Sequence, residues 1–142
     1  MINQSNLKIE YRYIVAAIYA IVLFLDRLDL TIVNITLPTL AEYFNVPITQ
    51  TEWINTAFLL ALAISIPISG WAGDRFGVKK VFIIATSLFG LSSLLCAFSP
   101  NLTVMALLRF LQGLGGGVII PVGMTMVYRV FDRSEYASIT SF

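Results

Sequence analysis

Long apolar runs alternate with short polar segments along this chain. Residues 53–73 and 81–108 contain no charged residue, and about 20 apolar residues are enough for a helix to cross the ~30 Å hydrocarbon core of a bilayer. Ser99, Pro100 and Asn101 divide the second run, because proline and its neighbours favour a turn. The pattern therefore predicts four transmembrane helices, at about residues 13–38, 53–72, 81–98 and 102–128.

The connection between the first two predicted helices is polar. The segment 39–51 contains Asn45, Pro47 and Thr49 and is predicted to be a loop. Glu52 then falls in the first turn of the second helix, where an acidic residue suits the helix dipole.

Composition supports an all-α polytopic membrane protein. Of the 142 residues, 58% are hydrophobic and 12% are charged, whereas soluble domains are about half apolar and about a quarter charged. There is no histidine and one cysteine, Cys96, which we expect to be a small packed apolar residue. We expect no metal, no cofactor and no nucleic-acid partner. We also expect no enzymatic activity, because Asp29, Glu52 and Asp74 lie at different depths and form no paired-carboxylate site.

The basic residues outside the predicted helices fall on one side of the membrane. The opposite side, at residues 39–52 and 99–103, contains no lysine or arginine. By the positive-inside rule, both chain ends and the segment 70–80 are predicted to be cytoplasmic. The seven basic residues on that side are Lys8, Arg12, Arg75, Lys79, Lys80, Arg129 and Arg133.

Charged residues also occur inside the first predicted helix. A charge at the bilayer centre costs at least ~2.5–3.5 kcal/mol, so it usually faces a cavity or a partner. Asp26 and Asp29 share one helix face, and Arg27 and Asn34 lie on a second. Two interpretations stay open: the helix lines a cavity with a titratable acid, or a pair between Asp26 and Arg27, or between Asp29 and Arg109, only fixes helix packing.

The fourth predicted helix has a polar, glycine-rich face. Arg109, Gln112, Gly113 and Gly116 recur at helical spacing, so a fixed cation and an amide share one face with residues that lack side chains. Gly113 and Gly117 have the spacing that permits close contact between helices. A phosphate-binding glycine loop is the alternative, but it would need a preceding strand, which the pattern does not predict.

The segment 70–80 joins the second and third predicted helices. Gly70, Gly73 and Gly77 are expected to let the backbone turn sharply, and Asp74 is placed to cap a helix or to pair with a base. Its basic residues would hold it at the anionic leaflet surface. We expect a mobile gating loop; a plain positive-inside loop is the alternative.

At these residues the chain resembles the major facilitator superfamily. Gly70-Trp-Ala-Gly-Asp-Arg-Phe-Gly-Val-Lys-Lys80 is similar to the signature loop Gly-x-Leu-Ala-Asp-Arg-x-Gly-Arg-Lys between helices two and three. It departs from that motif at Ala72 and Val78. The run Leu28-Asp-Leu-Thr-Ile-Val-Asn-Ile-Thr-Leu-Pro38 resembles a motif of the fourteen-helix drug:proton antiporters of the EmrB/QacA type. Residues 109–117 resemble the helix-four motif Arg-x-x-Gln-Gly-x-Gly-Ala-Ala. The matching signature-loop residues are Gly70, Asp74, Arg75, Gly77 and Lys79.

The resemblance implies a proton-coupled exporter of drugs or toxic small molecules in the inner (plasma) membrane. Asp29 would be the protonatable group, Arg109 would tune its protonation, and Asp74 and Arg75 would gate access. The chain would be the start of the N-terminal bundle, cut before helix five. Accessory residues would be Asp26, Arg27, Asn34 and Gln112, and helix packing would use Gly113 and Gly117.

The partners that follow are the lipid bilayer, protons, a small-molecule substrate, and the missing remainder of the transporter or another copy of the chain. Alternatives stay open. The chain could be a truncated remnant that does not transport, because alternating access needs two halves. It could be a small four-helix protein that self-associates through Gly113 and Gly117, or its substrate could be a metabolite, siderophore or sugar. Trp53, Phe58 and Tyr19 could line a drug cavity, but packing is the favoured interpretation.

Overall fold

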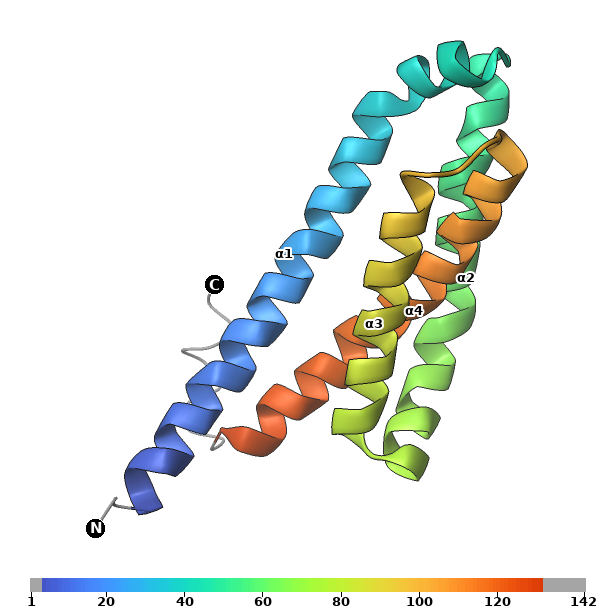
Figure 1. The fold of residues 1–142 in the computed structure, drawn as a ribbon. Helices are drawn as coiled ribbons and strands as arrows, with labels where there is room; N and C mark the ends of the chain where they lie inside the picture. Colours follow the sequence, from blue (N-terminus) through green and yellow to red (C-terminus); the bar gives the residue numbers. More distant parts are fainter. Residues whose placement is uncertain (1–3, 132–142) are drawn as a thin grey trace.

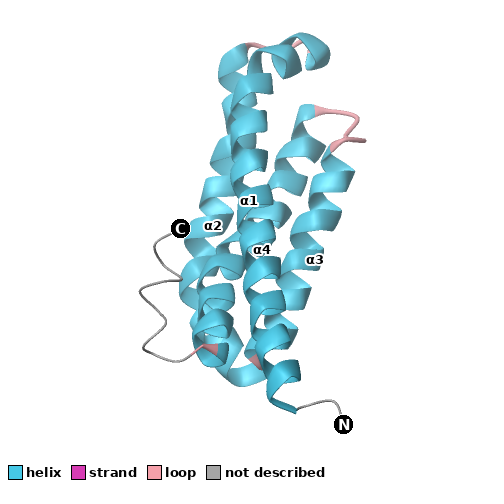
Figure 2. Cartoon of the chain, turned by 90° about the vertical axis from the view of Figure 1, so that its left-hand side faces the viewer, coloured by secondary structure: helices cyan, strands magenta, loops and turns pink. Residues whose placement is uncertain are grey.

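The computed structural model describes residues 4–131, and in this range the chain is a bundle of four helices without strands. Consecutive helices run in opposite directions (Figure 1). From the side, α1 lies across α4, with α2 and α3 on either side (Figure 2). The predicted all-α fold is confirmed. The four helices are α1 (Gln4–Phe44), α2 (Ile48–Phe76), α3 (Val78–Cys96) and α4 (Leu102–Val130).

Among the described residues, α2, α3 and α4 are long and apolar enough to cross a membrane. The 41-residue α1 is not one of these three, and its middle carries Asp26, Arg27 and Asp29. Its place in a bilayer therefore depends on how the other helices bury or pair these charges.

The connection between α1 and α2 is shorter than predicted. Helix α1 continues through Pro38 to Phe44, so much of the predicted loop 39–51 is helical, and Glu52 lies beyond the first turn of α2. Pro38 removes only one backbone donor and does not end the helix here. The chain turns instead at Asn45, whose φ is 52°, in the left-handed region that asparagine tolerates.

The segment 70–80 is helical except at Gly77, so the prediction of a loop here was wrong. Helix α2 runs to Phe76 and α3 begins at Val78. Gly77 has a φ of 89°, a conformation that glycine adopts without strain because it has no Cβ atom. Gly70 lies inside α2 and does not turn the chain. One residue therefore makes the whole corner between α2 and α3.

Helix α4 is the central helix, and two of its glycines face α2. A Cβ atom on Gly113 would lie 2.8 Å from the Cβ of Ala61, and one on Gly117 would lie 2.8 Å from the Cβ of Ser65. Both glycines are buried. The predicted close contact is therefore made inside the chain, and these glycines are not a free surface for self-association. They also lie within a helix, which excludes the phosphate-loop alternative.

Other α4 glycines allow close approach on further sides. A Cβ on Gly115 would lie 2.7 Å from the backbone oxygen of Ala85 in α3, and one on Gly123 would collide with the ring of Tyr19 in α1. Helix α4 can be central because its glycines leave room for the helices around it.

Apolar side chains fill the interior around α4. Phe58 is fully buried, as the packing interpretation predicted, and Tyr19 is partly buried with its hydroxyl donating to the Ile120 carbonyl at 3.1 Å. Trp53 differs, because its side chain is exposed. Residues 132–135, whose sequence is typical of the start of a further helix with Ser134 as its cap, lie outside the described residues. The largest cluster consists of Val22, Phe58, Val78, Val81, Phe82, Ala85, Phe89, Ile119 and Val122.

Candidate functional site

An ion pair joins α1 to α4. The Nη1 atom of Arg109 donates to Oδ2 of Asp29, 80 positions away in sequence. Arg109 is 1% exposed and Asp29 is 17% exposed, so the pair is largely shielded from solvent. Removing one partner of a buried pair leaves an uncompensated charge, at a cost of about 3–5 kcal/mol. One of the two pairings considered from the sequence therefore forms.

Two further side chains hold the Arg109 guanidinium in place. Gln112, one turn later on α4, accepts a hydrogen bond from Nη1 at 2.9 Å through its Oε1 atom. The ring of Phe58 on α2 lies under the guanidinium, with 4.4 Å between Cζ and the ring centroid. Such cation–π contacts contribute about 0.5–2 kcal/mol. The Sγ atom of Cys96 lies 4.0 Å from the same Gln112 oxygen. The Arg109 guanidinium is therefore held by contacts with α1 and α2 and with a residue of its own helix, α4.

Asp26 lies on the same face of α1 as Asp29 but has a different environment. It is 3% exposed, and its Oδ1 atom has no hydrogen-bond partner within residues 4–131. That oxygen lies 3.4 Å from where a Cβ on Gly116 would stand. Arg27 is exposed, and the ion pairs found in the described range do not include one between Asp26 and Arg27.

The second polar face of α1 makes one contact with α2. Oδ1 of Asn34 accepts a hydrogen bond from Nδ2 of Asn55 at 2.6 Å. Arg27 is exposed beside Thr31, whose hydroxyl bonds the Arg27 carbonyl at 2.9 Å. Asn55 was not among the residues predicted from the sequence, although an amide in the uncharged run 53–73 was a usable signal.

The residues of the expected gate lie at the corner between α2 and α3. Asp74 does not cap a helix; it lies 4.0 Å from Arg129 at the end of α4, and both side chains are largely exposed. The Arg75 guanidinium lies over the rings of Trp71 and Phe76, at 5.9 and 6.0 Å. A long, exposed ion pair thus joins the corner to α4, in addition to the apolar packing around Val78 and Val122.

The two other predicted gate residues, Gly70 and Lys79, are exposed and lie within helices. In the described range neither residue forms a hydrogen bond or an ion pair with Asp29 or Arg109. The structure therefore separates the gate residues from the buried ion pair.

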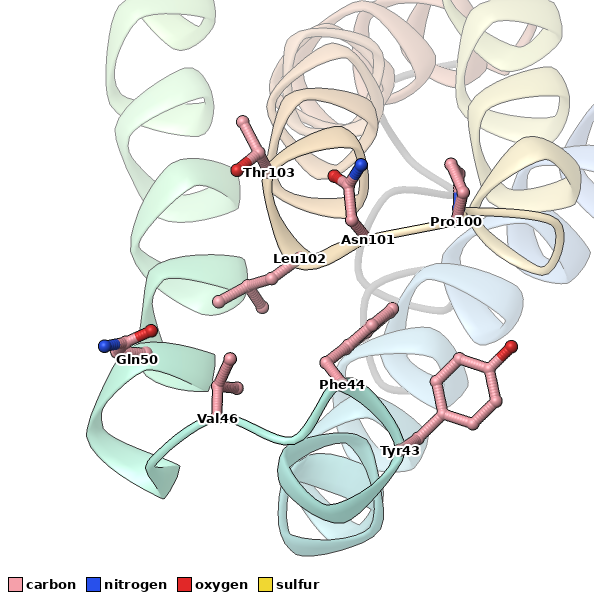
Figure 3. Close-up of a pocket in the computed structure, with 8 residues that line it drawn as sticks. All are labelled: Tyr43, Phe44, Val46, Gln50, Pro100, Asn101, Leu102 and Thr103. Atoms are coloured by element: carbon pink, nitrogen blue, oxygen red, sulfur yellow. The ribbon is translucent and has the colours of Figure 1, made fainter.

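A pocket of about 600 Å³ lies at the end of the bundle opposite the corner between α2 and α3 (Figure 3). Its lining comes from the end of α1 and the start of α2 with the connection between them, and from the α3–α4 connection and the start of α4. It contains no charged residue, so it is separate from the ion pair. The lining residues are Tyr43, Phe44, Val46, Gln50, Pro100, Asn101, Leu102 and Thr103.

Comparisons with known proteins agree on one family. The family model described as Major Facilitator Superfamily matches residues 19–142. A protein of Pectobacterium atrosepticum named "Putative multidrug resistance protein MdtD" is 39% identical over 119 residues, covering 84% of this chain and 26% of that protein. A protein of the same name from Salmonella paratyphi B is 37% identical over 125 residues, covering 88% and 27%. This chain thus spans about a quarter of the length of these curated relatives. No solved structure matches it.

Proposed function

This chain belongs to the major facilitator superfamily, and we propose that it is the N-terminal part of a proton-coupled exporter of drugs or other toxic small molecules. It is a multi-pass membrane protein of a transporter family, not of an enzyme family. Its relatives carry the name of multidrug resistance proteins, which supports drug efflux. Transport in this proposal also needs the remainder of the transporter or another copy of the chain, because alternating access requires two halves.

The buried pair of Asp29 and Arg109 is the observation that carries the proposal. While Asp29 is ionised, it holds the Arg109 guanidinium and so ties α1 to α4. A proton on Asp29 removes the negative charge and weakens this tie. Loss of the proton toward the cytoplasm would then favour the state that accepts substrate, and uptake of a proton from outside would drive release.

The corner at Gly77 would be the gate on the cytoplasmic side of the plasma membrane. The excess of lysine and arginine near this corner and near both chain ends supports a cytoplasmic location for all three. The contact between Asp74 and Arg129 supports a role in which this corner follows the movement of α4. Gly70, Arg75, Gly77 and Lys79 would complete the gate.

The test places this region in a complete transporter. Residues 19–142 of this chain, the part that the family model matches, replace the equivalent segment of the Pectobacterium relative. Inside-out vesicles are then assayed for proton-driven uptake of the cationic dye ethidium. We expect uptake by the chimera and at least a tenfold loss in Asp29→Asn. The matched control is Glu52→Gln, which changes an exposed acid on α2 and should retain uptake. Undiminished uptake in Asp29→Asn would refute proton coupling through this residue.

If the chimera is inserted and folded but ethidium is not transported, a metabolite or siderophore becomes the substrate to test. That result concerns the substrate alone. The Asp29→Asn comparison is then repeated with the substrate that the chimera does carry.

A further inference from the structure

We propose that Asp26 is a second proton-binding site, which holds its proton while Asp29 is paired with Arg109. Its role in transport rests on the proposed function above, but its protonation can be measured without transport. The site lies in the contact between α1 and α4, where the Asp26 side chain meets Gly116.

The first observation is the burial of an acid without a partner. Asp26 is 3% exposed, and its Oδ1 atom is enclosed without any hydrogen-bond donor in the described part of the chain. An ionised carboxylate in such a place loses hydration, and this oxygen gains no hydrogen bond in return, which favours a protonated carboxyl group. Because this oxygen is already enclosed, further helices packed outside the bundle would not reach it directly.

The second observation is the surroundings of Gly116, the α4 residue next to the Asp26 carboxyl group. The surroundings of Gly116 contain Oδ1 of Asp26 at 3.4 Å, Cδ2 of Leu62 at 3.6 Å and Cζ of Phe58 at 3.6 Å from the position of a Cβ atom. Helix α4 thus contributes a glycine and α2 contributes two apolar side chains. None of these three residues offers a side-chain donor to a carboxylate.

The third observation is that the buried cation nearby forms its ion pair with the other acid, through its Nη1 atom. The charged groups that act on Asp26 are Arg27 and Asp29 on α1 and Arg109 on α4. Arg109 bonds Asp29, and Arg27 is exposed. Within the buried cluster, the single positive charge of Arg109 balances the single negative charge of Asp29. An ionised Asp26 would place a second carboxylate charge beside Asp29, and like charges in one site oppose each other's ionisation.

These observations give an order of proton binding. Asp26 carries the first proton as a neutral carboxyl group, and Asp29 takes the second when the ion pair opens. Each step adds one proton to one carboxylate oxygen, and no other bond changes. The neutral Asp26 also lets α1 pack against Gly116 without a buried charge.

The test measures the carboxyl proton directly. The 142-residue chain is reconstituted in lipid nanodiscs at neutral pH, and infrared difference spectra record the carbonyl stretch of protonated carboxyl groups. We expect this band in the wild type, its loss in Asp26→Asn, and its retention in Asp29→Asn. The matched control is Asp74→Asn, an exposed acid at the corner between α2 and α3, which should leave the band unchanged. A wild-type protein without the band, or a band that survives in Asp26→Asn, would overturn the proposal.

Thermal unfolding of the same samples gives an independent readout. Asparagine has nearly the shape of a neutral aspartic acid, so Asp26→Asn should unfold at the temperature of the wild type. Asp29→Asn should unfold at a lower temperature, because it strands the buried Arg109 charge. Equal losses in the two variants would contradict a neutral Asp26. The failure of ethidium transport to depend on Asp29 would refute the proposed function while leaving the infrared result intact.

Discussion

The guanidinium group of Arg109 lies over the ring of Phe58, with 4.4 Å between Cζ and the ring centroid. This contact joins α4 to α2 at the level where Arg109 also binds Asp29 on α1. The fully buried Phe58 ring of α2 therefore helps to position the Arg109 charge. Helix α4 supplies this charge, and Asp29 of α1 pairs with it.

Replacing Phe58 should destabilise the bundle and loosen Arg109. Phe58→Ala removes a fully buried ring, and such changes cost about 3–5 kcal/mol. Unfolding in mild detergent, followed by circular dichroism, measures the loss. Phe98→Ala is the control, because Phe98 is 75% exposed and should change little. Equal effects of the two substitutions would show that Phe58 has no special role.

The two charges of the ion pair should depend on each other. Asp29→Asn leaves Arg109 buried without its charge partner and should cost about 3–5 kcal/mol. Arg109→Gln should cost less, because Asp29 is the more exposed partner. In a double-mutant cycle the two changes together should cost less than their sum, by about 0.5–3 kcal/mol. Simple additivity would mean that the pair contributes no coupling.

The contact between α2 and α4 should not tolerate an added methyl group. A Cβ on Gly117 would lie 2.8 Å from Ser65 Cβ and 3.0 Å from the Leu62 carbonyl oxygen. Gly117→Ala should therefore destabilise the bundle by about 1–3 kcal/mol. The control is Gly90→Ala on α3, where the added Cβ meets nothing within 4 Å. That variant should be neutral, or more stable by about 0.4–1 kcal/mol. The prediction fails if Gly117→Ala behaves like Gly90→Ala.

The corner between α2 and α3 should depend on the backbone freedom of Gly77. Its φ of 89° is unfavourable for alanine, although a Cβ there would meet nothing within 4 Å. Gly77→Ala should therefore cost about 1–3 kcal/mol from backbone strain alone. Gly70→Ala is the control that separates backbone strain from steric contact. A Cβ on Gly70 would also meet nothing within 4 Å, but Gly70 has a helical backbone inside α2. Calorimetry of both variants tests this: only Gly77→Ala should lower the unfolding temperature.

The ion pair between Asp74 and Arg129 should matter for movement more than for stability. The partners are 4.0 Å apart and 85% and 61% exposed, and surface pairs of this kind contribute about 0–1 kcal/mol. Asp74→Asn should leave the unfolding temperature unchanged while lowering ethidium uptake by the chimera. A large loss of stability would show that this contact is structural and would remove the argument for a gate.

The apolar pattern was sufficient to locate α2, α3 and α4, because charge-free runs of this length have few other solutions. It was insufficient at the connections. The charges around Asp74 suggested a loop, but the chain is helical there. A single glycine, Gly77, is enough to join the two helices. Pro38 likewise suggested an ending, yet α1 continues to Phe44. The hydrogen bonds that decide where a helix ends depend on local backbone geometry, which composition does not specify.

The candidate site was predictable where residues were unusual for a membrane helix. Asp29 and Arg109 stood out because charges are rare there, and the structure pairs them. Phe58 did not stand out as a partner of Arg109, since an aromatic residue in an apolar run has no distinguishing spacing. Which of the two acids on α1 receives Arg109 depends on how far α1 is shifted along α4. That shift is a tertiary property, set by contacts such as the one between Asp26 and Gly116.

The glycine-lined contact between α2 and α4 has a consequence for how this sequence can vary. At Gly113 and Gly117, α4 faces Ala61 and Ser65 of α2. The residues on both helices are already small, so there is no space for a larger side chain on either one. A related chain with a larger residue on one helix would need a smaller one opposite, and only glycine is smaller than alanine or serine. We therefore expect related chains to differ at this contact by paired substitutions, one on each helix. Single substitutions should be found mainly on the outer faces of α1 and α3.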